Sequence, residues 1–291
     1  MPELPEVQTT VNGLQTKVLE RTFVDVWSDW KKTIKKPDSF ADFKKELAGK
    51  KIKKIWRRAK NIIIDLSDGY SLLIHMKMTG HLLVGQWILK DGVWKPKEKG
   101  PMEEKINTFL HIIFMLDNGV MIALSDVRKF AKIEFWKTEE LLVSPGFLRL
   151  GPEPLEKDFT FKKFEAIFKK KKGKVKQVIM NPEVIAGVGN IYASEALWHA
   201  CIHPEKRVEK LSTQELKSLL SAIKKVLLVG IKFGGDSFSD YRDVDGRHGQ
   251  FENKKMVYQR EGEGCKRCQE KIKRIVFGAR SAFFCPRCQV L

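Results

Sequence analysis

Cysteine is scarce in this sequence, and long apolar stretches are missing. Five of the 291 residues are cysteine, a usage that suits a reducing cytoplasm better than a disulfide-linked secreted domain. No run of 18 apolar residues occurs, so we expect no membrane-spanning helix. The first residues also lack the cationic and then apolar pattern of a secretory signal. These shortages favour a cytoplasmic globular protein without a membrane partner.

Acidic residues are also in short supply. There are 36 of them against 54 lysines and arginines, which gives a formal net charge of +18. The basic residues gather in two segments, 50–60 and 169–176. Such clusters favour a polyanion, nucleic acid above all, as the partner. A lysine-rich solvated surface is the alternative.

The length of the chain predicts about two domains. Short apolar runs at 62–66, 71–74 and 110–116 are separated by turn sequences, which is typical of antiparallel strands. We therefore predict an antiparallel sandwich or barrel over residues 1–140. Within it, residues 86–105 are polar and lysine-rich, and we interpret them as a surface insertion.

A proline- and glycine-rich break at 148–154 is the best domain boundary, inside a linker over 141–154. Helical spacing and a capping box, Ser212 to Glu215, follow it. We expect a helical domain over 155–255. Its last part, 233–255, is a glycine-rich loop, and a loop of that length is usually functional or disordered.

Four of the cysteines form two Cys-x2-Cys pairs near the end of the chain, separated by 16 residues: Cys265, Cys268, Cys285 and Cys288. Four thiolates at this spacing can bind one zinc ion and leave no position open for water. We predict a structural zinc ribbon over 256–291, with disulfides as the alternative. Arg280 lies in the segment between the pairs, where it either points at a ligand or is a solvated turn residue. Cys201 stands alone.

The chain begins Met1-Pro2-Glu3-Leu4-Pro5-Glu6. Removal of Met1 would free a secondary amine that is partly neutral near pH 7 and can attack an aldehydic carbon. Glu3 would lie within reach of that amine as a proton donor or acceptor. The alternative is that Pro2 only eases removal of Met1 and that Pro5 only starts a helix. Apolar residues at 7, 11, 14 and 18 predict such a helix.

Three further motifs are weak when taken singly. Residues 184–193 predict a glycine turn before a helix that begins near Asn190, an arrangement that binds phosphate. Residues 57–60 form a basic strand edge. Met78 and the stretch 126–130 could supply residues that wedge into a base stack, with core filling as the alternative for Met78 and Phe130.

Together these motifs closely resemble the bacterial formamidopyrimidine-DNA glycosylase family. The resemblance covers nearly the whole chain, in family order. Its motifs are the Pro-Glu-Leu-Pro-Glu-Val start, Arg-Arg-Ala-Lys at 57–60, His75-x-x-Met78-x-Gly80, Asp126-x-Arg128-x-Phe130, residues 150–155, residues 187–195, and the zinc ribbon that ends at Gln289.

The resemblance implies an α+β fold, in which a helix-backed β-sandwich is followed by a helix–two-turn–helix domain and the zinc ribbon. It implies a bifunctional glycosylase and abasic-site lyase that acts on double-stranded DNA carrying oxidised or abasic nucleotides. One structural zinc ion, a monomer and a bacterial cytoplasmic location go with it. The implied catalytic residues are Pro2, Glu3, Lys60 and Arg280, with Glu6 nearby. The implied DNA contacts are His75, Met78, Arg128, Phe130, Lys172, Lys176 and Asn190, and the 233–255 loop would cap the lesion.

Departures from the family pattern leave alternatives open. Phe109 stands where the family commonly has a histidine that contacts DNA, and the 86–105 insertion is longer than usual. Leu4 favours oxidised purines, chiefly 8-oxoguanine and formamidopyrimidines, over the oxidised pyrimidines of the endonuclease VIII-like branch. Two other hypotheses are a catalytically idle zinc protein that binds damaged DNA and an unrelated proline-amine enzyme such as a tautomerase.

Overall fold

The computed structural model describes residues 1–237 and 240–291. They form two compact units: residues 1–148 with 233–252, and residues 149–232 with 253–291. The division at Leu148 falls next to the proline- and glycine-rich break. Residues 233–252, which the sequence division assigned to the helical domain, group with the first unit. Phe238 and Ser239 of the expected capping loop lie outside the described residues.

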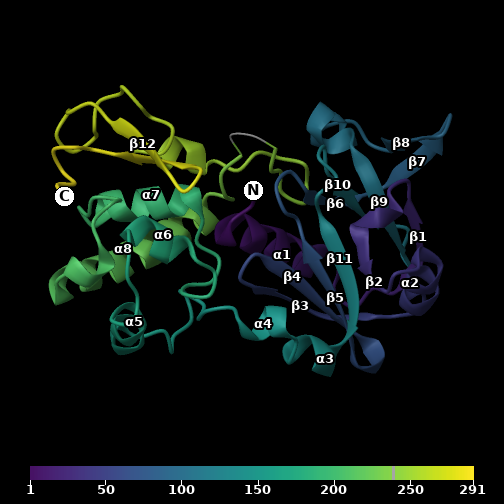
Figure 1. The fold of residues 1–291 in the computed structure, drawn as a ribbon. Helices are drawn as coiled ribbons and strands as arrows, with labels where there is room; N and C mark the ends of the chain where they lie inside the picture. Colours follow the sequence, from purple (N-terminus) through teal and green to yellow (C-terminus); the bar gives the residue numbers. More distant parts are fainter. Residues whose placement is uncertain (238–239) are drawn as a thin grey trace. The chain divides into compact units, whose positions relative to one another are not determined.

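Two large sheets form the sandwich of the first unit (Figure 1). One has the order β1-β9-β10-β6 and the other the order β2-β11-β5-β4-β3. All their pairings are antiparallel except that of β2 with β11. The three apolar runs that were predicted as strands, 62–66, 71–74 and 110–116, lie in β4, β5 and β9. The expectation of an antiparallel sandwich is confirmed. The strands are β1 (Phe23–Ser28), β2 (Ile34–Lys36), β3 (Ile52–Arg58), β4 (Asn61–Leu66), β5 (Tyr70–His75), β6 (His81–Gly85), β9 (Leu110–Leu116), β10 (Met121–Ser125) and β11 (Lys132–Lys137).

Helix α1 (Leu4–Val18) packs against this sandwich and begins directly after Pro2 and Glu3, two of the predicted catalytic residues. Its predicted apolar face is buried in the same core as strand residues such as Ile64 and Phe114. Glu6 lies in its first turn and Lys17 in its last, which suits the helix dipole. Burial of one helical face therefore fixes where the start of the chain lies on the first unit. Helix α2 (Phe40–Leu47) also packs into this core.

The polar stretch expected as a surface insertion is an ordered hairpin, β7 (Trp87–Lys90) with β8 (Val93–Pro96). Two short 3₁₀ turns follow, η3 (Pro101–Glu103) and η4 (Lys105–Thr108). Trp87 is buried against the outer face of the sandwich, and Trp94 packs edge-on against Trp27 with ring centroids 5.7 Å apart. The two tryptophans, which the polar composition of the stretch does not suggest, thus pack the insertion onto apolar residues of β6, β9 and β10.

The second unit is helical and ends in a hairpin. Ser212 and Glu215 cap α8 reciprocally, as the capping box predicted, with N–H to oxygen distances of 2.9 and 3.2 Å. Buried Glu195 accepts the backbone N–H groups of residues 256–258 and so ties α7 to the segment before the cysteines. The elements are α5 (Phe161–Phe168), α6 (Val175–Met180), α7 (Asn190–His199), α8 (Thr213–Lys232), β12 (Lys273–Phe277) and β13 (Arg280–Phe284).

The remaining elements are short. Two small helices, α3 (Thr138–Leu142) and α4 (Pro145–Leu148), end the first stretch of the first unit, and Phe147 packs edge-on against Trp56. The other 3₁₀ turns are η1 (Lys31–Thr33), η2 (Ser67–Gly69), η5 (Val208–Lys210) and η6 (Phe251–Lys254). Within the described ranges, none of the helices has the length and apolar character that crossing a bilayer requires.

Candidate active site and zinc centre

The start of α1 is a buried, hydrogen-bonded end of a helix. Pro2, Glu3 and Glu6 are all buried. The Glu3 N–H donates to Glu6 Oε2 at 2.7 Å, as in a capping box. The helix and this bond together fix the backbone at Glu3. They therefore also fix the direction of the chain at the neighbouring Pro2, which would carry the amine.

The segment after α8 lies against this helix end. The Asp236 N–H donates to Glu6 Oε1 at 2.7 Å, and the Tyr241 hydroxyl donates to the Glu6 carbonyl at 3.0 Å. Gly235 approaches so closely that a Cβ there would lie 2.8 Å from the Glu6 carboxylate. Glu6 therefore organises the site by holding two backbone N–H groups. Sequence reasoning placed Glu6 near the site but gave no sign of Tyr241.

Lys60 is the second residue of the two-residue turn between β3 and β4. Arg57 on β3 donates through Nε to Gln8 of α1 at 2.9 Å and through Nη1 to the Ala59 carbonyl at 3.1 Å. Ala59 has a φ of +54°, a left-handed conformation that turns the chain sharply before Lys60. These bonds hold the turn against the first half of α1, the half that follows Pro2 and Glu3.

His75, at the end of β5, is surrounded by positive charge. Burial, followed by the charges of Lys77, Lys132 and Lys60, lowers the pKa of His75 to about 3. Its Nδ1 accepts the Lys77 N–H at 2.9 Å, so the neutral ring keeps its proton on Nε2. At neutral pH the His75 ring is therefore uncharged, with Nε2 as its hydrogen-bond donor.

The three expected wedge residues are exposed. Met78 keeps 40% of its surface in solvent and Phe130 keeps 51%, which argues against the core-filling alternative for both. The Arg128 guanidinium lies 4.6 Å from the centroid of the Phe130 ring. Exposed apolar side chains next to a stacked arginine match the demands of a group that enters a base stack.

Asp126 joins the two turns that carry these wedge residues. Its carboxylate accepts the Thr79 hydroxyl in a short hydrogen bond, the Ala131 N–H at 2.8 Å and the Arg128 N–H at 3.3 Å. Thr79 in turn accepts the Arg128 N–H at 3.1 Å. The motif quoted from the sequence includes Asp126, but only the structure shows that it holds both turns together.

In the second unit, Arg280 lies at the first position of β13 and is exposed. It lines a cavity of about 220 Å³ together with Lys176, Gln177, Met180, Asn181, Phe277 and Gly278. Lys176 is 1% exposed, and its Nζ donates to Ser194 Oγ at 2.9 Å and to the Ser281 carbonyl at 2.8 Å. Lys176 thus connects α7 to the β12–β13 hairpin through two hydrogen bonds. Lys172, in contrast, is exposed.

Asn190 is the first residue of α7, as the glycine-turn motif predicted. Its side-chain oxygen is buried and has no hydrogen-bond partner within the described part of the chain. No hydrogen bond through Oδ1 therefore fixes the orientation of the Asn190 side chain. The N–H groups of the first turn of α7 add the positive polarity that favours an anion.

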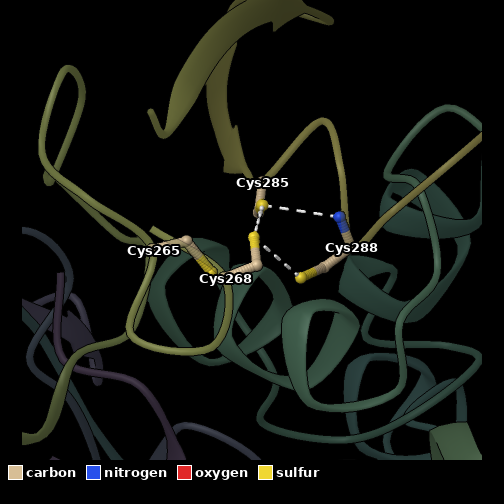
Figure 2. A group of neighbouring side chains, drawn as sticks. All are labelled: Cys265, Cys268, Cys285 and Cys288. Atoms are coloured by element: carbon tan, nitrogen blue, oxygen red, sulfur yellow. Dashed lines mark hydrogen bonds between the residues drawn. The ribbon is translucent and has the colours of Figure 1, made fainter. Parts of the chain in front are cut away.

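The four predicted zinc ligands converge (Figure 2). Their sulfur atoms all lie within 4.8 Å of one another, and Cys268 is 3.4 Å from both Cys285 and Cys288. A tetrahedron with Zn–S bonds of about 2.3 Å has edges of about 3.8 Å, so the cluster fits one zinc ion with four thiolates and no open position. Trp198 Nε1 and the Arg267 N–H reach the Cys265 sulfur at 3.3 and 3.4 Å, as donors to a thiolate would.

Comparison with known proteins agrees with this geometry. The formamidopyrimidine-DNA glycosylase N-terminal domain matches residues 1–133, its helix–two-turn–helix domain matches 150–242, and a zinc finger found in such glycosylases and isoleucyl-tRNA synthetases matches 262–290. A formamidopyrimidine-DNA glycosylase of Ligilactobacillus salivarius is 35% identical over all of this chain and 99% of its own length. The chain belongs to the formamidopyrimidine-DNA glycosylase family. It is accordingly a DNA glycosylase and lyase of base excision repair with a structural zinc site.

Solved structures of family members share its fold. The Lactococcus lactis enzyme in complex with DNA containing Fapy-dG superposes with a TM-score of 0.85 at 32% identity, over 99% of this chain and 100% of the other. A family member in complex with DNA containing carbocyclic 8-oxo-G gives a TM-score of 0.85 at 32% identity, over 100% of both chains. The expected fold of sandwich, helical domain and zinc ribbon is confirmed.

The structure thus groups the predicted site residues in two sets. Pro2, Glu3 and Glu6 share one helix end, and Lys60, His75 and the wedge residues belong to the same unit. Lys172, Lys176, Asn190 and Arg280 belong to the other unit, as do the zinc ligands.

Proposed function

We propose that the protein removes oxidised purines, 8-oxoguanine and formamidopyrimidines, from double-stranded DNA and then cleaves the strand. The observation that carries the proposal is the start of α1, where Pro2 and Glu3 are buried at a helix end that Glu6 holds in one geometry. Solved structures of relatives in complex with DNA containing Fapy-dG or carbocyclic 8-oxo-G support this choice of lesion. The enzyme is proposed to act as a monomer in a bacterial cytoplasm.

The chemistry begins after removal of Met1. The Pro2 nitrogen attacks C1′ of the damaged nucleotide, the glycosidic bond breaks, and the base leaves with a proton from an acid in the site. Opening of the sugar ring gives an iminium ion, the Schiff base. Loss of the C2′ proton then expels the 3′ phosphate, and a second elimination expels the 5′ phosphate. Glu3 transfers protons during base loss and ring opening, and Lys60 is a proton donor at the backbone of the lesion.

The DNA must be distorted before this chemistry, because a duplex hides C1′ from an attacking amine. Extrusion of a nucleotide costs a few kcal/mol. Met78, Arg128 and Phe130 fill the vacated space, with Arg128 facing the orphaned partner base. Lys172, Asn190 and Arg280 hold phosphates, and Arg280 assists the second elimination. Lys176, which the resemblance also implied as a phosphate contact, is buried and instead bonds to the hairpin that carries Arg280. His75 adds a neutral donor, and the net charge of +18 gives salt-sensitive non-specific affinity.

The test is a panel of duplexes that carry 8-oxoguanine, formamidopyrimidine, thymine glycol or an abasic site, each incubated with and without borohydride. We expect a covalent complex with the first two and the last, and a one-nucleotide gap with phosphate at both ends. Preference for thymine glycol would instead indicate the endonuclease VIII-like alternative. Binding to lesions without any nicking would indicate a catalytically idle DNA-binding protein and overturn the proposal.

A further inference from the structure

The insertion between β6 and β9 holds a buried arginine of the segment that follows α8. The Arg242 side chain is 5% exposed, and its Nε donates to Glu104 Oε2 at 2.8 Å. Its Nη2 makes a second, short bond to Glu104 Oε1, which completes a two-pronged pair of the kind that fixes orientation as well as position. The third prong, Nη1, donates to the Tyr241 carbonyl at 2.8 Å. Arg242 therefore joins the insertion to the backbone of Tyr241.

Asn107, in η4 just after the insertion, provides a second attachment between the insertion and this segment. Its Nδ2 donates to the Gly246 carbonyl at 3.1 Å and to the Pro101 carbonyl at 2.8 Å. Gly246 has a φ of +76°, and a Cβ there would lie 2.8 Å from that Nδ2. On its other side, Asn107 Oδ1 contacts His81 Nε2 at 2.8 Å. The insertion is thus attached to both ends of the stretch 241–246.

Tyr241 carries this attachment to α1. Its hydroxyl donates to the Glu6 carbonyl at 3.0 Å and lies 3.4 Å from the Thr10 hydroxyl. Burial raises the pKa of Tyr241 above its ordinary value, so the hydroxyl keeps its proton and remains a donor. A continuous path of hydrogen bonds therefore runs from Glu104 through Arg242 and Tyr241 to the first turn of α1.

We propose that Glu104 is a positioning residue, which acts through Arg242 and Tyr241 to hold the first turn of α1 in the geometry that the Pro2 amine needs. This inference rests on the proposed role of Pro2. The insertion thereby has a role: Trp87 and Trp94 pack it onto the sheet of β6, β9 and β10, and this packing fixes the segment that carries Glu104. A reacting amine that is displaced by about 1 Å loses up to about a hundredfold in rate.

The test compares the Glu104→Gln variant with Glu98→Gln. Glu98 is an exposed glutamate of the same insertion, so both changes remove one negative charge from the same region. Each protein is mixed in excess with a duplex that carries a preformed abasic site, and the rate of borohydride trapping is measured beside the Kd. We expect Glu104→Gln to trap about tenfold more slowly with a Kd within about twofold of the wild type, and Glu98→Gln to match the wild type in both.

The Tyr241→Phe variant removes only the hydroxyl at the far end of the path. It should slow trapping to a similar extent, and the double variant should be no slower than the slower single variant, because both break one path. Amide hydrogen exchange in residues 4–10 should rise in both single variants but not in Glu98→Gln. Equal trapping by Glu104→Gln and Glu98→Gln, or slowing that multiplies in the double variant, would overturn the proposal.

The exchange measurement separates this proposal from the assignment of Pro2. If the wild-type protein traps no DNA, Pro2 is not the nucleophile. A rise in exchange confined to Glu104→Gln and Tyr241→Phe would then still support the link from Glu104 to α1, and unchanged exchange would refute it.

Discussion

At the start of α1, Glu3 and Glu6 are buried, and the Glu6 carboxylate accepts two backbone N–H groups, whereas Arg280 lies exposed at the start of β13, in the four-cysteine ribbon. The first region gets its geometry from the packed sandwich. The second has little apolar core of its own, and its four thiolates take the place of one. A change of one residue should therefore affect chemistry alone in the first region, and metal, local fold and DNA affinity together in the second.

The largest expected effect is loss of the attacking amine. Pro2→Gly should reduce borohydride trapping on abasic DNA by roughly a thousandfold or more, as removal of a nucleophile does, while DNA affinity and the thermal midpoint stay close to wild type. A protein that keeps an extension before Pro2 should behave in the same way, because its proline nitrogen is part of an amide. Trapping at the wild-type rate by both proteins would refute the assignment of Pro2.

Loss of the metal should be the next largest effect. Cys285→Ser leaves three thiolates, so we expect the protein to lose zinc and most of its lesion-specific DNA affinity, because structural zinc contributes about 10 kcal/mol or more to the folding of such ribbons. The unfolding transition of the first unit should remain. Cys201→Ser is the matched control, since Cys201 is exposed and lies outside the cluster. Full affinity in metal-free Cys285→Ser protein would contradict the comparison.

Features set by local patterns could be predicted from the sequence. The spacing of Val7, Val11 and Leu14 gave the buried face of α1, and the cysteine spacing gave the zinc cluster, because periodicity and ligand spacing are local properties. The resemblance supplied the order of the domains.

Polar contacts between distant segments could not be predicted. Glu104 and Arg242 are 138 positions apart, and Glu6 and Asp236 are 230 apart. A charged residue does not reveal its partner, and the tertiary fold alone brings these pairs together. For the same reason the resemblance implied Lys176 as a DNA contact, whereas the structure buries this residue and bonds its ammonium to the Ser281 carbonyl of the hairpin.

A smaller effect is expected beneath the wedge residues. Asp126→Asn should keep the fold but weaken the bonds that join the two turns, at a cost of about 1–2 kcal/mol. We expect the rate on a lesion within a duplex to fall about tenfold. The rate on a single-stranded abasic substrate should not change, because it needs no extrusion. Asp117→Asn, in an exposed turn, is the control. Equal slowing on both substrates would show that Asp126 acts elsewhere than in extrusion.

The smallest effect distinguishes a neutral DNA contact from a charged one. Because the folded pKa of His75 is about 3, lower than the unfolded value near 6.5, acidification from pH 7 to 5.5 should cost the folded state about 1 kcal/mol through this residue.

The His75→Gln variant cannot take up this proton, so between pH 7 and 5.5 it should lose about 1 kcal/mol less stability than the wild type. Thermal unfolding at the two pH values measures the difference. At pH 7 the variant should keep the wild-type slope of log K against log salt, because a neutral ring releases no counterion from DNA. Lys172→Met should reduce the slope by about one. If His75→Gln reduced the slope as Lys172→Met does, His75 would be charged when DNA is bound, and burial and the surrounding lysines would not keep it neutral there.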